Sequence, residues 1–273
     1  MIINIFIKTN NIMGKNREEK YSRPSIPEDI KREVRKRCGF GCVICGSPIY
    51  DYEHMEEWSI VQRHKADEIT LLCPMHHREK TAKRMPPFIV KEANKNPHNF
   101  KSGVSDPYEV LYYQDDITVK LGFMKFQFIN KENGAYLVPL VVDRVPIILI
   151  EIIDEHYSIN MNLFDENNNL VLKIENNSLV YGIGLWDVTF QANRLTVREM
   201  KNKIFIEIVF EVPNVLSIPR GVIYCNGEKL TLTPSSVVFD NHNFRMEGDG
   251  GLVCQFGIVM GEGKDEFPGG IKI

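Results

Sequence analysis

The sequence has no long apolar run. Its most apolar stretch, Val138–Ile153, is interrupted by prolines and charged residues, whereas a membrane helix needs roughly 18 consecutive apolar residues. Residues 1–12 are mildly apolar, but they lack the basic start and the small-residue cleavage site of a secretory signal peptide. They are either a short edge strand or lie ahead of a true start at Met13. We therefore expect a cytoplasmic protein that has no contact with a membrane.

Cysteine is scarce, with six residues in 273. Three of them belong to the paired motifs described below. The other three, Cys38, Cys225 and Cys254, are expected to remain free thiols, which agrees with a reducing compartment.

The net charge is small, at −3, but it is distributed unevenly. Residues 13–101 carry 18 Lys and Arg against 13 Asp and Glu, whereas residues 102–273 carry 14 against 23. The first part is therefore basic and the second is acidic. Because a polyanion attracts a basic surface and repels an acidic one, we expect only the first part to approach nucleic acid.

Two metal-ligand motifs stand out in the basic part. They are Cys42-x-x-Cys45 and Cys73-x-x-His76, with 27 residues between them. Three thiols and an imidazole in paired clusters suit a tetrahedral structural zinc site, and the metal would help a small region to fold. Two alternatives stay open, because Cys38 or His77 could replace one of the four ligands.

The residues around these motifs predict a strand–loop–strand–helix unit. Ser25 and Glu28 match a capping box, so a helix is expected from about residue 25. Its apolar face would consist of residues four apart, Ile26, Ile30 and Val34. A strand is expected at 49–55, a loop at 56–68, a second strand at 69–72, and a helix from Pro74 to about residue 83.

The rest of the chain predicts an all-β domain. Residues 91–107, rich in Asn, Lys and Pro, are expected to be a linker after a first domain at 25–90 and an arm at 1–24. From residue 108 to 273, short β-branched runs alternate with Asn, Asp and Gly turns. A sandwich and a β-helix or solenoid both remain open, and residues 247–270 are expected to be a loop. The predicted fold class is therefore α+β.

Three residues near the motifs are not needed by the zinc. Glu53 and His54 are adjacent in the first expected strand, and His77 lies in the first turns of the helix. A carboxylate and an imidazole can hold a divalent ion while leaving positions open for water and substrate oxygens. A neighbouring neutral histidine can take a proton from water near pH 7. This set would suit the hydrolysis of a phosphodiester.

At this point the chain resembles the HNH endonuclease family. The zinc-bearing branch of that family has CxxC, then an acidic residue or His followed by His, then LC-x-x-CH-x-x-K. This sequence has CVIC, YEH and ITLLCPMHHREKT, and the likeness covers about residues 38–83, a sixth of the chain. It implies a ββα-metal nuclease domain that acts on DNA.

The resemblance also implies residue roles. His54 would be the general base that activates water, and Glu53 and His77 would hold a catalytic Mg²⁺ or Mn²⁺. The chain departs from the family's pattern at three positions, with His76 in place of Cys, Glu53 in place of Asp or His, and Glu68 in place of Asn. His64 in the loop is a further candidate, as a positioning or metal-binding residue.

Four basic residues are candidate phosphate contacts. Lys80 and Arg84 follow His77 at helical spacing, and Arg35 and Lys36 lie on the first helix. Solvated helix surfaces are the alternative interpretation of both groups.

The expected function is metal-dependent endonuclease activity on DNA. Restriction or antiphage defence would suit it, although no residue indicates that role. A protein without activity, which binds nucleic acid or acts as an adaptor, is the alternative. In either case the β-domain could form a homo-oligomer or bind a protein partner.

Overall fold

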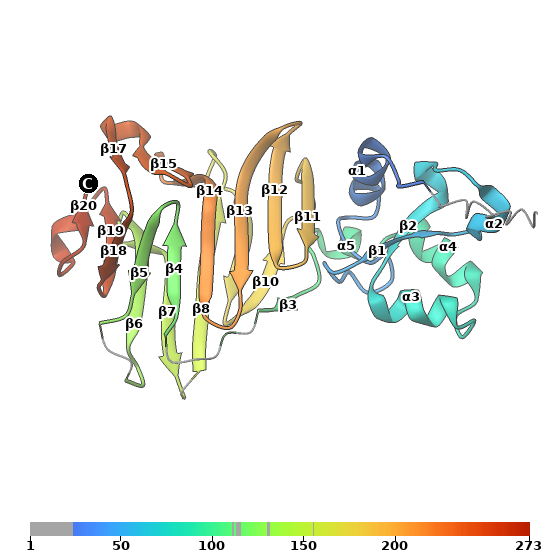
Figure 1. The fold of residues 1–273 in the computed structure, drawn as a ribbon, viewed down its shortest axis with the longest axis horizontal. Coiled ribbons are helices and arrows are strands. Elements are labelled where there is room, and N and C mark those ends of the chain that lie inside the picture. Colours follow the sequence, from blue (N-terminus) through green and yellow to red (C-terminus); the bar gives the residue numbers. More distant parts are fainter. Residues whose placement is uncertain (1–23, 111, 113–115, 130–131, 155) are drawn as a thin grey trace, which may run out of the picture.

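The computed structural model describes residues 24–110, 112, 116–129, 132–154 and 156–273. It has a small part rich in helices, followed by a large part made of strands (Figure 1). The arm predicted at 1–24 lies outside the described residues, apart from residue 24. The fold class is α+β, as the sequence predicted, and no helix in the described ranges is long and apolar enough to cross a membrane.

The small part contains two strands and a series of short helices. The elements are α1 Glu28–Arg37, β1 Asp51–His54, α2 Trp58–Val61, the 3₁₀ helix η1 Ala66–Glu68, β2 Ile69–Leu72, α3 Pro74–Thr81, α4 Pro87–Lys95 and α5 Asn99–Ser102. Strands β1 and β2 pair antiparallel, with Glu53 opposite Thr70. The expected capping box does not form, because Pro27 is the N-cap of α1 and no side chain caps the helix.

The small part has a core of its own. Val34 of α1, Leu71 and Leu72 of β2, and Val90 of α4 are completely buried there. The residues predicted as a linker, 91–107, differ from that expectation because they belong largely to this packed region. Asn99 is buried, and its amide donates to the carbonyl of Gly39 at 2.8 Å.

The large part is built from eighteen strands among the described residues. Its first strands are β3 Tyr108–Glu109, β4 Thr118–Leu121, β5 Met124–Gln127, β6 Tyr136–Val142, β7 Val145–Ile153, β8 His156–Phe164, β9 Leu170–Glu175, β10 Ser178–Tyr181 and β11 Asp187–Gln191. Its remaining elements are β12 Arg194–Met200, β13 Lys203–Glu211, β14 Val215–Cys225, β15 Glu228–Thr233, β16 Ser236–Phe239, η2 Asp240–His242, β17 Phe244–Glu247, β18 Gly250–Val253, β19 Phe256–Met260, η3 Lys264–Glu266 and β20 Ile271–Lys272.

These strands form one large sheet that closes into a barrel, seen in Figure 1 as a nearer and a farther layer of strands. One series of antiparallel neighbours runs from β6 to β10, and another runs from β11 to β17. A solenoid would stack parallel strands, so the solenoid alternative is wrong. The expected loop at 247–270 is also wrong, because β18 pairs parallel with β5 and β19 pairs parallel with β6.

The two layers enclose one apolar core. Ile148 and Ile150 come from β7, Val197 comes from β12, and Ile206 comes from β13. Alternate residues of these strands point inward, as the period of two in a strand requires. Phe40 of the small part joins the same core, and the Tyr181 hydroxyl donates to the Phe40 carbonyl at 2.7 Å.

A buried ion pair joins the two parts. The guanidinium of Arg35 on α1 donates to both carboxylate oxygens of Asp187 on β11, each at 2.8 Å, and both residues are almost completely buried. Burial alone would lower the pKa of Arg35, but its hydrogen bonds with Asp187 and Tyr52 outweigh that effect and raise it. Arg32 adds a second contact, because its guanidinium lies 3.6 Å from the centre of the Trp186 ring.

Asp187 is expected to be needed for stability. Replacing it by Ala leaves the buried Arg35 charge without its main partner, which costs about 3 kcal/mol. Urea denaturation of Asp187→Ala checks the prediction, with Asp249→Ala as the matched control, because Asp249 pairs with Lys125 on the exposed surface. If both variants have the same unfolding midpoint, the ion pair does not hold the two parts together.

Candidate metal and catalytic site

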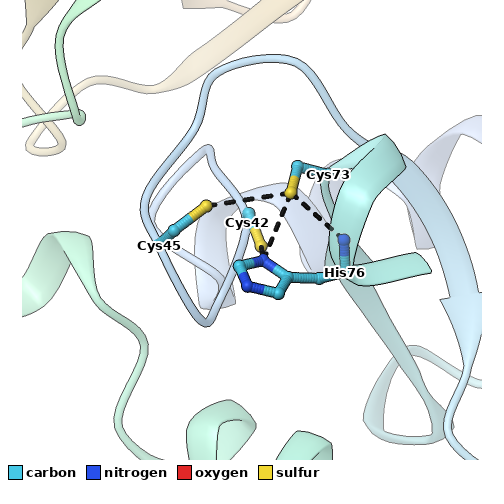
Figure 2. Close-up of side chains that lie close together, drawn as sticks. All are labelled: Cys42, Cys45, Cys73 and His76. Atoms are coloured by element: carbon cyan, nitrogen blue, oxygen red, sulfur yellow. Dashed lines mark hydrogen bonds between the residues drawn. The ribbon is translucent and has the colours of Figure 1, made fainter. Parts of the chain in front are cut away.

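Four side chains form a compact cluster beside α3 (Figure 2). They are Cys42, Cys45, Cys73 and His76, and their ligand atoms all lie within 4.8 Å of one another. His76 Nδ1 is 3.4 Å from Cys42 Sγ and 3.2 Å from Cys73 Sγ, and the sulfurs of Cys45 and Cys73 are 3.8 Å apart. These residues can hold a metal ion, as the motifs predicted.

The first pair of ligands is placed by a tight turn. Gly46 N donates to Cys42 O at 2.7 Å, and Cys42 N donates to Ser47 O at 2.9 Å. Val43 N donates to Leu71 O at 3.0 Å and thereby attaches this turn to β2. The turn therefore presents Cys42 and Cys45 next to the point where β2 leads into α3.

The first turn of α3 separates two adjacent histidines. Cys73 is the N-cap of the helix, and its Sγ accepts a hydrogen bond from His76 N at 3.5 Å. His76 faces the thiols, whereas His77 Nε2 lies 3.0 Å from Glu53 Oε2. Successive helical side chains point about 100° apart, so the two imidazoles serve different neighbours. The alternative in which His77 completes the cluster is wrong.

Cys38 also lies outside the cluster. Its Sγ is 3.9 Å from Thr70 Oγ1, and burial raises the pKa of its thiol. In the cluster itself, the hydrogen bond between Cys42 and Cys45 lowers the pKa of the Cys42 thiol to about 4. The same hydrogen bond raises the pKa of the Cys45 thiol. The cluster thus favours a thiolate, the form that metals bind.

On the other face of α3, His77 lies between two carboxylates. Its Nε2 is 3.0 Å from Glu53 Oε2, and its Nδ1 is 3.4 Å from Asp51 Oδ2. Asp51 and Glu53 are two residues apart on β1, so their side chains share one side of the strand. If Asp51 accepts the proton on Nδ1, the lone pair of His77 is directed to Nε2, beside Glu53.

Glu53 and His77 lie at hydrogen-bond distance from each other and could also hold a divalent ion together. Neighbouring ligand atoms of an octahedral ion with bonds of about 2.1 Å lie about 3 Å apart. The 3.0 Å between Glu53 Oε2 and His77 Nε2 agrees with this spacing. A carboxylate on the other imidazole nitrogen is a common support for a metal-bound histidine, and Asp51 lies at that position.

Lys80 closes this side of the site. Its ammonium makes an ion pair with Glu53 and donates to the main-chain oxygen of His54 at 2.8 Å. The side chain is only 11 % exposed. Lys80 therefore lies within the site, next to the Glu53 carboxylate, and its bond to the His54 main chain also holds the end of β1.

His54 lies at the end of β1 in a group of aromatic rings. It is 3 % exposed, its ring centre is 5.2 Å from that of Trp58, and Trp58 stacks on His64 at 4.8 Å. His54 Nε2 is 3.3 Å from both Arg63 O and His64 Nδ1. A carbonyl oxygen can only accept, so the proton of a neutral His54 belongs on Nε2.

His64 supports the same assignment. Its Nε2 lies 2.9 Å from the carbonyl oxygen of Pro24, so that nitrogen donates and its Nδ1 can accept from His54 Nε2. The lone pair of a neutral His54 is therefore on Nδ1. The sequence proposed His64 for positioning or for metal binding, and the structure brings it to His54.

Glu68 holds the loop that contacts His54. The Arg63 side chain binds the Glu68 carboxylate, with Nε at 3.0 Å from Oε2, and lowers the pKa of Glu68. The main-chain oxygen of Glu68 also accepts from Met55 N at 2.9 Å, just after β1. Glu68 thus fixes, through Arg63, the carbonyl that orients the His54 ring.

Glu53, His54 and Lys80 line one cleft of about 640 Å³. Adjacent residues on a strand normally face opposite sides, but these two lie at the strand end, where both reach the cleft. The sequence-predicted pair therefore borders one cleft, although the His54 side chain is almost completely buried.

The four basic candidates have different environments. Arg35 is 1 % exposed and bound to Asp187, so its prediction as a nucleic-acid contact is wrong. Lys80 is bound to Glu53, as described above. Arg84 is exposed and paired with Glu79, and Lys36 is exposed beside a cleft between α1 and the β-part.

Sequence reasoning missed Asp51, Trp58 and Arg63. Asp51 could have been found, because a strand that contains Glu53 places residue 51 on the same side. Trp58 and Arg63 carried no local signal, because the loop at 56–68 has no regular period. Only the fold shows that this loop returns to His54.

Cys45→Ser is expected to lose one tightly bound metal ion per chain, because three ligands hold it much less strongly than four. Elemental analysis of purified protein by mass spectrometry measures this. Cys254→Ser is the matched control, since Cys254 is a free thiol outside the cluster. A Cys45→Ser protein with full metal content would contradict the four-ligand site.

His76→Ala and His77→Ala are expected to differ in the same measurement. His76→Ala should lose the tightly bound metal, whereas His77→Ala should keep it, because only His76 faces the thiols. Loss of the metal in both variants, or in His77→Ala alone, would contradict the division between the two histidines.

Comparisons of the chain with protein-family models, with curated proteins and with solved structures find no match. The likeness to HNH endonucleases therefore depends on the motif residues alone, and the function has to be argued from their geometry.

Proposed function

We propose that the protein is a metal-dependent endonuclease of the HNH type that hydrolyses phosphodiester bonds in DNA. The observation that carries this proposal is the Glu53–His77 pair, with 3.0 Å between Oε2 and Nε2. Glu53 of this pair lines the same cleft as His54. A metal-binding pair and a histidine with an assigned lone pair are the groups that hydrolysis of a phosphodiester needs. The basic charge of residues 13–101 supports a polyanionic substrate.

Zinc is the ion that best suits the Cys42, Cys45, Cys73 and His76 cluster. Tetrahedral Zn–S bonds of about 2.3 Å would place two sulfurs about 3.8 Å apart. Cys45 and Cys73 have this separation. A closed set of four protein ligands is typical of a structural zinc, and its role here would be to hold β2, α3 and the preceding turn together.

The catalytic ion would be Mg²⁺ or Mn²⁺, held by Glu53 and His77. When bound, it would neutralise charge that develops on the phosphate oxygens. Asp51, whose Oδ2 lies 3.4 Å from His77 Nδ1, would orient the His77 ring, and Lys80 fixes the Glu53 carboxylate. Lys80 is also near enough to the cleft to contact a phosphate, although its present partner is Glu53.

His54 would be the general base. Its Nδ1 carries the lone pair, because Arg63 O and His64 Nδ1 accept from Nε2. It would take a proton from the water that attacks phosphorus, and the positive charge that results would be stabilised by the Arg63 carbonyl. Glu68 serves this step indirectly, since it keeps Arg63 in place.

His54→Ala is expected to reduce cleavage at least about 100-fold, the usual range for loss of a general base. Nicking of supercoiled plasmid in Mg²⁺ or Mn²⁺ measures the rate, with EDTA as the metal-free control. The tightly bound metal should be unchanged, because His54 is not in the cysteine cluster. His242→Ala is a matched histidine control on the β-part, and it should cleave like the wild type.

Two outcomes would count against the proposal. If His54→Ala cleaves at the wild-type rate, the assignment of the base is wrong. If the wild type binds DNA but does not cleave it with either ion, the alternative of a non-catalytic nucleic-acid-binding or adaptor protein is favoured.

A further inference from the structure

The residues that line the candidate catalytic cleft are of two kinds. The polar ones include Glu53, His54, Lys80, Thr81 and Lys83, which we call the polar wall. The apolar ones include Trp58, Ile60, Met85, Pro86 and Pro87, which we call the apolar wall. The catalysis proposed above uses only the polar wall, so the apolar wall needs a separate explanation.

Core packing does not explain the apolar wall. Ile60 is 72 % exposed, and α2, which carries it, has no buried residue. Pro86 and Pro87 are exposed as well, and their rings restrict the backbone there. Trp58 is held in place by its stacking on His64. The wall is thus a preformed apolar surface directly beside His54, and such surfaces commonly bind a ligand.

An unpaired nucleotide has a group that suits each wall. In a duplex, the bases are stacked inside and the phosphates face outward, so the flat faces of the bases cannot lie on an apolar wall. An unpaired nucleotide can turn its base onto an apolar or aromatic surface while its phosphate stays on a polar one. A cleft of about 640 Å³ is within the range that accommodates a small organic group.

Charge at the edge of the cleft favours the same occupant. Lys80 and Lys83 lie on the polar wall, whereas Glu56 and Glu57 lie next to the apolar wall. Glu56 is paired with Lys91, and Glu57 is exposed. A duplex would bring a second phosphate backbone towards these carboxylates, but a single strand has only one backbone, which can follow the lysines.

From these contacts we infer that the cleft binds an unpaired nucleotide, with its base on the wall formed by Trp58, Ile60, Met85, Pro86 and Pro87. The preferred substrate is then DNA with single-stranded segments rather than continuous duplex. This inference concerns the substrate of the proposed nuclease site and rests on that proposed function for cleavage, but the base contact itself can be tested by binding.

The test is fluorescence anisotropy with the full chain, in Ca²⁺ in place of Mg²⁺ or Mn²⁺. Three labelled probes are compared: a short single strand, the same strand with abasic sites, and the blunt duplex. The single strand should bind about tenfold more tightly than either of the other two, because contact with one base is worth about 1–3 kcal/mol. Equal binding of the normal and abasic strands would overturn the inference.

Ile60→Ser tests whether the apolar wall contacts the base. It should weaken binding of the normal single strand about fivefold, which corresponds to about 1 kcal/mol of lost apolar contact, and leave the abasic strand unaffected. Val253 on β18 is a similarly exposed aliphatic residue, and Val253→Ser should leave the binding of both strands unchanged. If Ile60→Ser binds the normal strand like the wild type, the wall does not contact the base.

Cleavage assays with Mn²⁺ separate this inference from the proposed function. Cleavage of duplex as fast as of single strand would overturn the inference and leave the nuclease proposal standing. Base-dependent binding with no cleavage of any probe would contradict the nuclease proposal and support the binding site by itself.

Discussion

The cluster of Cys42, Cys45, Cys73 and His76 is the constraint on which the rest of the small part depends. It ties the turn after α1 to the first turn of α3, and that turn carries His77 next to His76. The orientation of α3 therefore decides where His77 meets β1. A region with a core of this size has little apolar area to hold that orientation by itself, so a bound metal would contribute strongly to it.

The four residues of strand β1 all contact other parts of the structure. Asp51 and Glu53 contact His77, Tyr52 accepts from Arg35 at 2.7 Å, and His54 meets the loop of Trp58 and Arg63. These residues thus fix the strand to three different neighbours, with Asp51 and Glu53 sharing His77. Because Arg35 also binds Asp187, one side of the strand is attached to the β-part through a single guanidinium. The candidate site and the large sheet are consequently parts of one packed structure.

Neighbouring basic residues of helix α1 have different roles because their environments differ. In sequence, Arg35 and Lys36 belong to one charge run, and either is equally suited to a phosphate contact. In the fold, Arg35 is buried against a carboxylate 152 residues away, whereas Lys36 stays exposed. A buried guanidinium needs a carboxylate partner, and Asp187 on β11 is that partner for Arg35 on α1.

Local patterns in the sequence determined much of this protein. The x-x spacing of the ligand pairs and Pro74 at the start of α3 are short-range signals that agree with the structure. Ile30 and Val34 of α1 pack on the core as predicted, and Ile26 packs there too, but it precedes the helix. Most of the β-branched runs after residue 108 are strands for the same reason, since a half-buried strand has a period of two.

Tertiary structure decided what depends on distant residues. It separated His76 from His77, buried Arg35, joined residues 91–102 to the small part and brought Asp51 to His77. It also placed the loop of Trp58, Arg63 and His64 around His54, from a segment without a regular pattern. These contacts depend on packing and burial between distant segments, which no local stretch of the chain contains.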